Sequence, residues 1–448
     1  MTLAARRGPD GRDAFVFDGH DVPPTIRVAP GDTLKIHYVN ALPDPREAAI
    51  RGGPVNMTNL HFHGLSVSPD RPQDDVLDMI VMPGNALDYT LSIPHDHPPG
   101  LYWYHTHPHG ESHQQVLDGM SGALIVEGIE RYAPAVRSMR ERILVIRETD
   151  IEHNRHASAL KARVEVERTR CGDSHDEVGR LFTINGVLRP EITMQPGERQ
   201  FWRIVNAGPD RYVDVEIPGQ RLEIVAYDGL PIAYHDPEHP TRQVDHVVIP
   251  PAGRVEAIVT ADAREGRSAF LTRCVNTGPD GDPNPEMILA DVVSTKTAPS
   301  ATEPASAAAP TPPVFTRVDV EHVERQPPIF TVDFSESHKV FYINGQAFSA
   351  DAPPMVRAKV GTLAHWRIVN STRELHPLHI HQAHFLAFLE NDRPISDPHW
   401  LDTVNVPIGG SVDVIMDFTN PVIRGMSVFH CHLLNHEDKG MMAKILFE

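Results

Sequence analysis

One sequence unit recurs three times along the chain, and this repeat limits the fold more than any other feature. Its copies read IRVAPGDTLKIHYVN at 26–40, ITMQPGERQFWRIVN at 192–206 and VRAKVGTLAHWRIVN at 356–370. The residues that close them, Asn40, Asn206 and Asn370, are 166 and 164 residues apart. A chain of 448 residues has room for about three units of this size. We therefore expect three copies of one domain.

Each copy has the pattern of β-structure. A second repeated segment consists of a strand, a Pro/Gly turn and a strand of alternating polarity. Its copies read IVMPGNALDYTLSI from Ile80, VVIPPAGRVEAIV from Val247 and VNVPIGGSVDVIM from Val404. Units of this size predict an all-β chain of three consecutive Greek-key β-sandwich or barrel domains. The charged segment from Asp150 to Glu177 breaks the strand pattern, and we expect a short helix or a long loop there.

Composition indicates where the domains end. Residues 297–313 are nearly all Ala, Pro, Ser and Thr, which predicts an extended linker. The repeat and this linker divide the rest of the chain into residues 1–135, 136–296 and 314–448, called units one, two and three below.

Charge and cysteine content exclude several classes of protein. The formal net charge of −19 argues against nucleic-acid binding, which depends on neutralising phosphates. No run reaches the roughly 18 apolar residues of a membrane helix, so we expect no membrane association. The N-terminus MTLAARRGPDGRDAF lacks an apolar signal segment, so either the protein is cytoplasmic or a leader has been removed. Three cysteines cannot form a disulfide framework, and Cys171 and Cys274 of unit two could form one disulfide or stay free thiols.

Histidine is the unusual residue type, with 27 in the chain, and many of them are clustered. The clusters are NLHFHG (59–64), WYHTHPHG (103–110), LHPLHIH (375–381) and FHCHLLNHEDKGMM (429–442). They contain His61, His63, His105, His107, His376, His379, His381, His430, His432 and His436, together with Cys431 and Met441. Clustering of this kind indicates metal or proton chemistry.

Each of the four clusters contains a His-x-His pair, and this spacing has a geometric meaning. On a strand, residues i and i+2 point to the same face, roughly 6.6–6.8 Å apart, so both imidazoles of a pair can reach one metal cluster. One such pair is more often an ordinary surface or core feature. Four pairs supply eight imidazoles, more than one metal can bind, and indicate a multinuclear site. Imidazole suits copper, zinc and iron, and the nearby thiolate and thioether narrow the choice towards copper.

Cys431 would point to the opposite face of its strand from His430 and His432. It could therefore bind one metal while its neighbours bind others, with the backbone joining the two sites. Blue-copper electron-transfer sites use two His, one Cys and a weak axial Met, and the chain offers His376, Cys431, His436 and Met441. The histidines expected to be structural or solvated include His37, His95, His97, His109, His113 and His384. Of these, His109 and His384 are close enough to the clusters to support ligands by hydrogen bonds.

The units differ in the ligands that they can supply. Unit one has Thr106 where unit three has Cys431, and Thr58 where unit three has His376. Unit one can therefore form half of the cluster but no blue-copper site. Unit two has Leu271–Thr272–Arg273 at the place of His430–Cys431–His432 and supplies no ligand. We expect the cluster between units one and three, with unit two as a spacer and a wall of the substrate cleft.

With these motifs the chain resembles the three-domain multicopper oxidases of the bacterial laccase type. HFHG, HTH, HPLHIH and HCHLLNHEDKGM match the family pattern in order and spacing, over essentially the whole chain. The resemblance implies three cupredoxin-like domains and four copper ions. It implies type 1 copper on His376, Cys431, His436 and Met441, type 2 copper on His61 and His379, and a type 3 pair on His63, His105, His107, His381, His430 and His432.

The reaction that the resemblance implies is one-electron oxidation of a small donor near the exposed edge of His436 or His376. Electrons would pass through Cys431 to its two neighbours, and O₂ would be reduced by four electrons to two waters. This reduction needs an acid near the cluster. Glu437 matches a proton-relay acid of bacterial relatives, and Asp74 or Asp75 is the expected second acid.

The donor is less well defined than the metal sites. Cuprous-ion oxidases often carry a Met-rich insert, whereas residues 382–430 hold only Met416 and Met426, so phenols or aromatic amines are the expected donors and Cu(I) the alternative. A copper-storage or copper-resistance protein is a further alternative. A copper nitrite reductase is disfavoured because it has two cupredoxin domains and lacks the paired motifs of unit one. The resemblance also implies a periplasmic or secreted protein, commonly a monomer.

Overall fold

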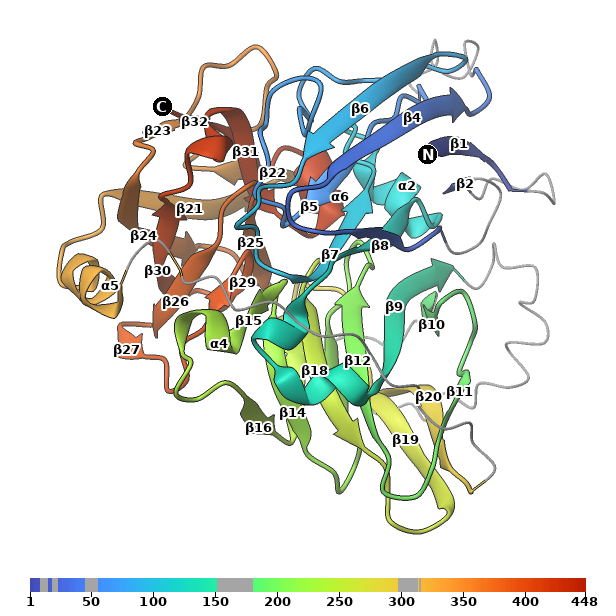
Figure 1. The fold of residues 1–448 in the computed structure, drawn as a ribbon. Helices are drawn as coiled ribbons and strands as arrows, with labels where there is room; N and C mark the ends of the chain where they lie inside the picture. Colours follow the sequence, from blue (N-terminus) through green and yellow to red (C-terminus); the bar gives the residue numbers. More distant parts are fainter. Residues whose placement is uncertain (9–14, 18–22, 45–54, 151–179, 297–312, 314–315) are drawn as a thin grey trace.

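The computed structural model describes residues 1–8, 15–17, 23–44, 55–150, 180–296, 313 and 316–448. Within them the chain consists of short β-strands with a few short helices (Figure 1). Two sheets form in each unit, and the prediction of an all-β chain of three domains is confirmed. Three expectations fall outside the described residues: the conformation of residues 151–177, the linker apart from Pro313, and the pairing of Cys171.

Unit one contains two four-stranded sheets, with strand orders β2-β1-β4-β6 and β3-β8-β7-β5. The strands are β1 (Thr2–Arg7), β2 (Phe15–Phe17), β3 (Ile26–Val28), β4 (Thr33–Ala41), β5 (His61–His63), β6 (Ala86–Ser92), β7 (Gly100–His105) and β8 (Ser121–Val126). Helix α2 (Ser112–Leu117) lies between β7 and β8, and two 3-10 turns, Ile129–Arg131 and Pro134–Ser138, lead into unit two.

Unit two has sheets in the orders β10-β9-β12-β18-β14-β15, with β16 beside β14, and β11-β20-β19-β13-β17. Its strands are β9 (Arg140–Asp150), β10 (Arg180–Ile184), β11 (Glu191–Met194), β12 (Arg199–Asn206), β13 (Val213–Glu216), β14 (Leu222–Tyr227), β15 (Leu230–Pro231), β16 (Arg242–Val244), β17 (His246–Ile249), β18 (Arg254–Thr260), β19 (Gly266–Arg273) and β20 (Met287–Ser294). Helix α4 (Ile232–His235) follows β15.

Unit three repeats this plan, with the orders β22-β21-β24-β30-β26-β27, with β28 beside β26, and β23-β32-β31-β25-β29. Its strands are β21 (Phe330–Ser337), β22 (Val340–Ile343), β23 (Val356–Ala358), β24 (Thr362–Asn370), β25 (His376–Ile380), β26 (Phe385–Glu390), β27 (Arg393–Pro394), β28 (Trp400–Leu401), β29 (Thr403–Val406), β30 (Ser411–Phe418), β31 (Gly425–Cys431) and β32 (Met442–Phe447). The helices are α5 (Arg317–Glu324) and α6 (Leu434–Asp438), and Pro421–Ile423 is a 3-10 turn.

The asparagine that closes each repeat has the same structural task in all three units. Asn40, Asn206 and Asn370 are buried near the ends of β4, β12 and β24. Each side-chain amide donates to two backbone carbonyls: Asn40 to Asn56 and Val81, Asn206 to Arg211 and Ile249, and Asn370 to Glu374 and Val406. The amide therefore fixes the end of one strand to the loop that enters the next, and satisfies carbonyls that burial removes from water.

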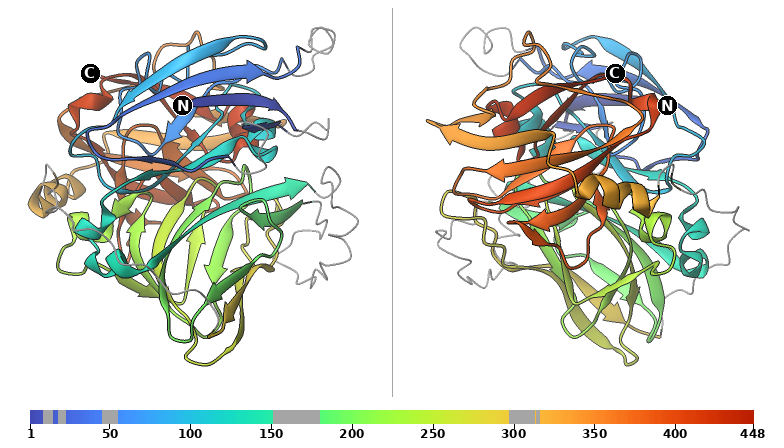
Figure 2. Two further views of the ribbon diagram at one scale, coloured as in Figure 1. Left: turned by 45° about the vertical axis from the view of Figure 1, so that its right-hand side comes forward. Right: turned by 90° about the vertical axis from the view of Figure 1, so that its left-hand side faces the viewer.

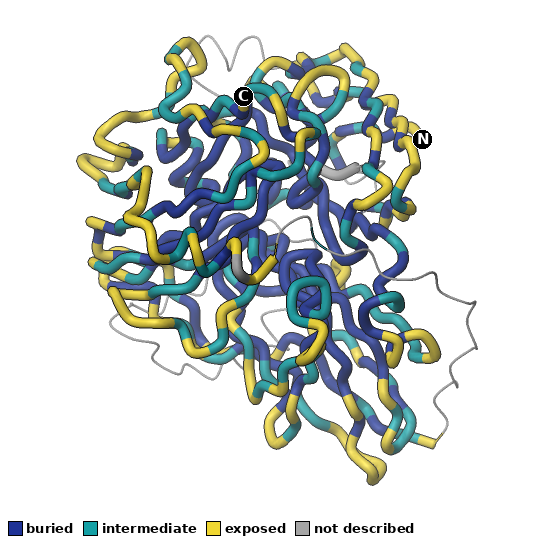
Figure 3. The backbone as a smooth tube through the Cα atoms, turned by 60° about the vertical axis from the view of Figure 1, so that its left-hand side comes forward, coloured by how far each residue is buried: buried dark blue, intermediate teal, exposed yellow. Residues whose placement is uncertain are grey.

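The three units pack against one another, so that sheets far apart in the sequence become neighbours. Figure 1 shows units one and three side by side, with unit two below them, and the turned views of Figure 2 agree. In Figure 3 the buried backbone is concentrated inside the units and where they meet, while exposed segments form the outer loops. No helix in the described part of the chain has the length and apolar character needed to cross a membrane.

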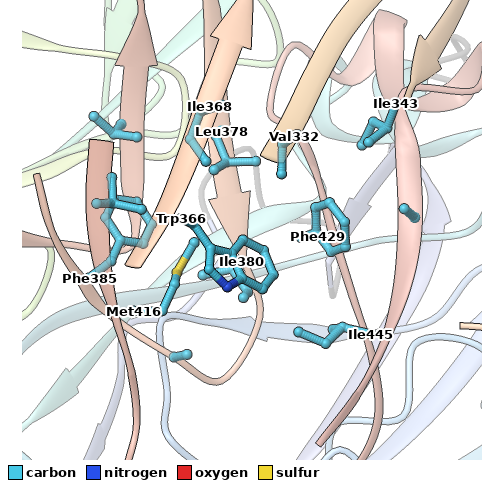
Figure 4. Packing of buried hydrophobic residues seen from close by; sticks show 14 of the residues in the cluster. Val332, Ile343, Trp366, Ile368, Leu378, Ile380, Phe385, Met416, Phe429 and Ile445 are labelled. Atoms are coloured by element: carbon cyan, nitrogen blue, oxygen red, sulfur yellow. The ribbon is translucent and has the colours of Figure 1, made fainter. Parts of the chain in front are cut away.

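The core of unit three lies between its two sheets. Trp366 of β24 and Phe429 of β31 meet edge to face at its centre, with ring centroids 5.7 Å apart (Figure 4). Leu378 and Ile380 of β25 point into the same core. Because side chains alternate along a strand, the residues between them point out of this core, towards unit one.

Candidate metal centre

The two faces of β25 and β31 carry two different sets of polar side chains. Cys431 shares the core face of β31 with Phe429, and His376 lies beside it on the core face of β25. His379 and His430 occupy the opposite faces and are directly paired across the two strands. Alternation along two neighbouring strands thus separates one site inside unit three from another at its surface towards unit one.

Strands β5 and β7 of unit one present the same pattern from the other side. Phe62 packs in the core of unit one, while His61 and His63 on either side of it face outward. His61 is paired with His105 across the strands, just as His379 is paired with His430. In unit two the corresponding paired positions are occupied by Glu216 and Leu271, so this unit presents no histidine pair at this place.

Eight histidines from units one and three meet between the two units and are fully buried. His107 and His381 each approach His430, with Nε2–Nε2 distances of 3.3 and 3.1 Å. The ligand atoms of these three residues all lie within 4.8 Å of one another. Three imidazole nitrogens converging from two domains form a candidate metal site.

The other five histidines complete the cluster. His63, His105 and His432 have ring centroids 5.1 to 5.8 Å apart. His61 and His379 lie 6.0 Å apart, and each stacks on a ring from the other unit: His61 on His381 at 3.7 Å, and His379 on His63 at 3.8 Å. Neither unit alone forms the cluster, as the sequence repeat led us to expect.

In several of these histidines, one ring nitrogen contacts a protein oxygen, and the other ring nitrogen is left available to a metal. Nδ1 of His105 lies 2.9 Å from the Thr106 carbonyl, Nδ1 of His379 lies 2.8 Å from the Asp402 carbonyl, and Nδ1 of His430 lies 2.9 Å from the Cys431 carbonyl. The opposite nitrogens of His61, His105 and His379 have no hydrogen-bond partner among the described residues. Orphaned buried nitrogens cost free energy unless they bind something, so these rings fit metal ions.

Burial keeps these histidines neutral, which is the state that binds metal. Desolvation lowers the pKa of His105 to about 3 and that of His430 to about 4. It lowers the pKa of the others well below the ordinary value; these are His61, His63, His107, His379, His381 and His432. The cluster therefore offers lone pairs and no positive charge.

The second site lies inside unit three and combines sulfur with nitrogen. Sγ of Cys431 is 3.3 Å from Nδ1 of His376 and 3.9 Å from Nδ1 of His436, and the two nitrogens are 3.3 Å apart. Met441 is buried, and its carbonyl accepts a hydrogen bond from the Cys431 amide at 3.1 Å. Burial raises the pKa of the Cys431 thiol, so a bound cation is needed to hold it as a thiolate. This donor set fits copper.

Unit one shows why the same site does not form twice. Thr58, at the place of His376, is hydrogen-bonded to Tyr38 and Gln115, with Oγ1 2.8 Å from the Tyr38 hydroxyl and 3.0 Å from Gln115 Oε1. Thr106, at the place of Cys431, is buried between His105 and His107. Neither side chain is a soft metal ligand.

Of the acids expected near the cluster, two lie against its rings. Glu437 has one oxygen 3.5 Å from Nδ1 of His107 and the other 3.7 Å from Nδ1 of His430. The carboxylate of Asp74 lies 3.0 Å from Nδ1 of His61. Asp75 instead accepts backbone hydrogen bonds in its own turn and pairs with Arg71. The structure therefore places Asp74, and not Asp75, beside the cluster.

These two acids are deeply buried. Desolvation raises the pKa of both Glu437 and Asp74 well above the ordinary value for a carboxyl group. Ser112 donates to Glu437 at 3.2 Å, and Gln382 donates to Asp74 at 2.7 Å. Both carboxyl groups are therefore poised to hold a proton next to the histidine rings.

Sequence reasoning missed a further acid at the cluster, Asp402. Its carboxylate is buried and lies 3.2 Å from Nε2 of His63, and its partner is the guanidinium of Arg254 from unit two. Asp402 follows β28 and belongs to no histidine motif, and Arg254 is 148 residues away in the chain. His384, expected as a support, reaches the Asp228 carbonyl at 3.1 Å, and His109 lies beside His107 with ring centroids 5.9 Å apart.

A cavity of about 570 Å³ opens beside His436. Units two and three form it, so unit two walls this cleft. Its lining has two lysines, Lys339 and Lys439, and a larger number of carboxylates, which are Asp210, Asp280, Asp282, Glu336 and Glu374. Glu374 lies 3.3 Å from Nε2 of His436, the outer edge of the sulfur site. Desolvation, then the neighbouring carboxylates, raise the pKa of Glu374 to about 8. The cavity therefore has a negative potential that a cation would relieve.

Comparison with known proteins gives a consistent result. Three sequence models described as multicopper oxidase match residues 4–131, 148–290 and 321–448. The multicopper oxidase mco of Staphylococcus haemolyticus is 22% identical over 437 residues, covering 96% of this chain and 83% of the relative. The laccase of Bacillus subtilis is 23% identical over 469 residues, covering 94% and 87%. A solved multicopper oxidase from Campylobacter jejuni, described as a metallo-oxidase, superposes with a TM-score of 0.72 at 22% identity, covering 100% of this chain and 90% of that one.

Proposed function

Because the chain belongs to the multicopper oxidase family, we propose that it is a laccase-type oxidase that couples oxidation of small donors to reduction of O₂. The observation that carries this proposal is the sequence His430–Cys431–His432. It places a thiol in one metal site and the two neighbouring rings in the other. Storage of copper would need neither this junction nor the buried acids beside the cluster.

The four copper ions of the family are one type 1, one type 2 and a type 3 pair. When bound, they supply one-electron chemistry with the donor and four-electron reduction of O₂ to two waters. We assign type 1 copper to His376, Cys431, His436 and Met441, type 2 copper to His61 and His379, and the type 3 pair to His63, His105, His107, His381, His430 and His432.

The chain itself provides the connection between the two sites. The peptide groups on either side of Cys431 join its sulfur to the neighbouring rings through covalent bonds only. Nδ1 of His430 also lies 2.9 Å from the Cys431 carbonyl, which adds a shorter contact between the two residues. Strand β31, which is buried from Ser427 to Cys431, fixes this arrangement.

Glu437 and Asp74 are the proposed proton donors. Each contacts rings on a different side of the cluster, His107 and His430 for Glu437 and His61 for Asp74. Because burial raises the pKa of both acids, each holds its proton to a higher pH than an exposed carboxyl group does, and can release it where negative charge develops.

The proposed donors are phenols and aromatic amines, with Cu(I) as the second candidate. The acidic cavity beside His436 favours donors that carry positive charge, which are metal ions and aromatic amines with a separate cationic group, over neutral phenols. A metal-ion donor is also in keeping with the Campylobacter jejuni structure, which is described as a metallo-oxidase.

Oxygen uptake with three donors tests this proposal: an aromatic amine that carries a quaternary ammonium group, a neutral phenol and Cu(I). At a pH above the Glu374 pKa of about 8, where this carboxyl is ionised, we expect Glu374→Gln to raise the KM for the cationic amine about 3- to 10-fold and to leave the phenol nearly unaffected, because one carboxylate interacts with one charge at close range. Glu265→Gln, an exposed carboxylate outside the cavity, is the matched control. Equal changes for both donors would show that Glu374 acts on the metal site alone. Absence of uptake with every donor would contradict an oxidase.

A further inference from the structure

A buried arginine from the copper-free middle unit reaches the metal centre. Arg254 begins β18 and its side chain is fully buried. Its Nη1 and Nη2 donate to the two oxygens of Asp402 at 2.8 and 2.5 Å, which is the bidentate geometry of a strong arginine–carboxylate pair. The pair joins unit two to unit three.

Asp402 in turn touches histidines of both halves of the cluster. One carboxylate oxygen lies 3.2 Å from Nε2 of His63 in unit one. The backbone carbonyl of the same residue lies 2.8 Å from Nδ1 of His379 in unit three. Arg254, Asp402 and His63 therefore form a continuous chain of contacts through all three units.

The position of this pair is fixed from a third side by Asp228. One oxygen of Asp228 accepts the backbone amide of Arg254 at 2.8 Å, and the other accepts those of Asp402 and Thr403 at 3.1 and 3.2 Å. Nη2 of Arg254 also donates to the Asp228 carbonyl at 2.9 Å. The guanidinium thus has little freedom to leave Asp402.

The glycine of the HFHG motif provides a second, independent observation. A Cβ atom at Gly64 would overlap Nη2 of Arg254 and the Oδ2 atom of Asp402. Gly64 also has a φ of +83°, a conformation that disfavours other residues. The residue directly after His63 is thus one that gives the arginine–aspartate pair room to reach the ring.

We propose that Arg254 is a positioning residue of the metal centre, acting through Asp402 on His63. The carboxylate holds the Nε2–H of His63 and leaves Nδ1, which has no partner in the part of the chain that the structure describes, to bind copper. Unit two is therefore more than a spacer, because it supplies the charge that orients a ligand of unit one. This inference rests on the proposed function in one respect, that His63 binds copper.

The test compares Arg254→Lys with Arg203→Lys in the copper-loaded protein. Lysine keeps the charge and loses the bidentate geometry. Arg203 is an equally buried arginine of unit two, and its partner Glu256 accepts the Leu101 amide of unit one at 3.0 Å, so it also lies at a contact between units. The readouts are copper retained per chain against a chelator and the copper EPR spectrum. Asp402→Asn, which keeps the shape of the side chain, serves as a second variant.

We expect Arg254→Lys and Asp402→Asn to release cluster copper about 10- to 100-fold more readily than the wild type, with the blue band of the Cys431 site retained. Arg203→Lys should retain copper as the wild type does. Equal copper retention in the wild type, Arg254→Lys and Asp402→Asn would overturn this inference and leave the proposed function standing. A copper loss from Arg203→Lys as large as that from Arg254→Lys would do the same. A wild type that holds copper only at the Cys431 site would contradict the proposed function, and this inference with it.

Discussion

Replacing Cys431 with serine is expected to abolish both the blue absorption band and oxidation of the donor, while copper remains bound at the histidine cluster. The reason is geometric: the sulfur lies on the core face of β31, and the rings of the cluster lie on the other. Serine removes the thiolate on which the blue-copper site depends and leaves all eight cluster histidines in place. The visible spectrum, the copper content and the oxygen uptake measure the three parts of this result.

The matched control is Thr106→Ser, at the corresponding position of unit one, where the residue between two cluster histidines has no sulfur. It should leave spectrum and turnover unchanged. If Cys431→Ser still oxidised the donor, the connection through Cys431 to its neighbours would be wrong.

Neutral isosteres of the two buried acids should slow oxygen reduction in samples that carry the full copper content. We expect Glu437→Gln and Asp74→Asn each to lower kcat by about 10²- to 10⁴-fold, the usual contribution of a positioned proton donor. The contacts of these acids with His107, His430 and His61 are the basis for this expectation. Oxygen uptake at saturating donor measures kcat, and the copper content and the blue band show that the metal sites are filled.

Asp75→Asn is the control, because Asp75 is adjacent in sequence but turned towards Arg71 and its own turn. It should keep the wild-type kcat. A kcat that fell equally in Asp74→Asn and Asp75→Asn would remove Asp74 from proton delivery. A kcat that stayed unchanged in both Asp74→Asn and Glu437→Gln would remove both acids from it.

The sequence alone was sufficient to predict the fold class and the residues that meet in the cluster. Three copies of a strand–turn–strand segment ending in Asn implied one repeated domain, and the structure shows that each Asn binds two carbonyls at the same place. The His-x-His spacing predicted outward-facing pairs, because alternation along a strand is a local property. Both features depend on residues that are close together in the chain.

Features that depend on contacts between units were not predictable in the same way. The Arg254–Asp402 pair joins residues 148 positions apart and belongs to no motif. The acidic cavity combines Asp210 and Asp282 of unit two with Glu374 of unit three, and no single segment is unusually acidic. The choice between Asp74 and Asp75 also needed the fold, because neighbouring residues of a turn differ only in the direction of their side chains.

The scarcity of methionine near the sulfur site and the acidity of the adjacent cavity bear on the donor in different ways. The first speaks against a methionine-lined path for Cu(I), and the second favours donors with positive charge. Aromatic amines that carry a separate cationic group satisfy both conditions, since they are positively charged and need no soft ligands.

A chain that works as this oxidase holds four coppers in two connected sites and uses them to reduce O₂. A copper titration of the metal-free protein, followed by metal analysis, the visible spectrum and oxygen uptake on one sample, tests it most directly. We expect saturation at four coppers per chain, a blue thiolate band and oxygen consumption that depends on an added donor. Saturation at one or two coppers without oxygen consumption would contradict it.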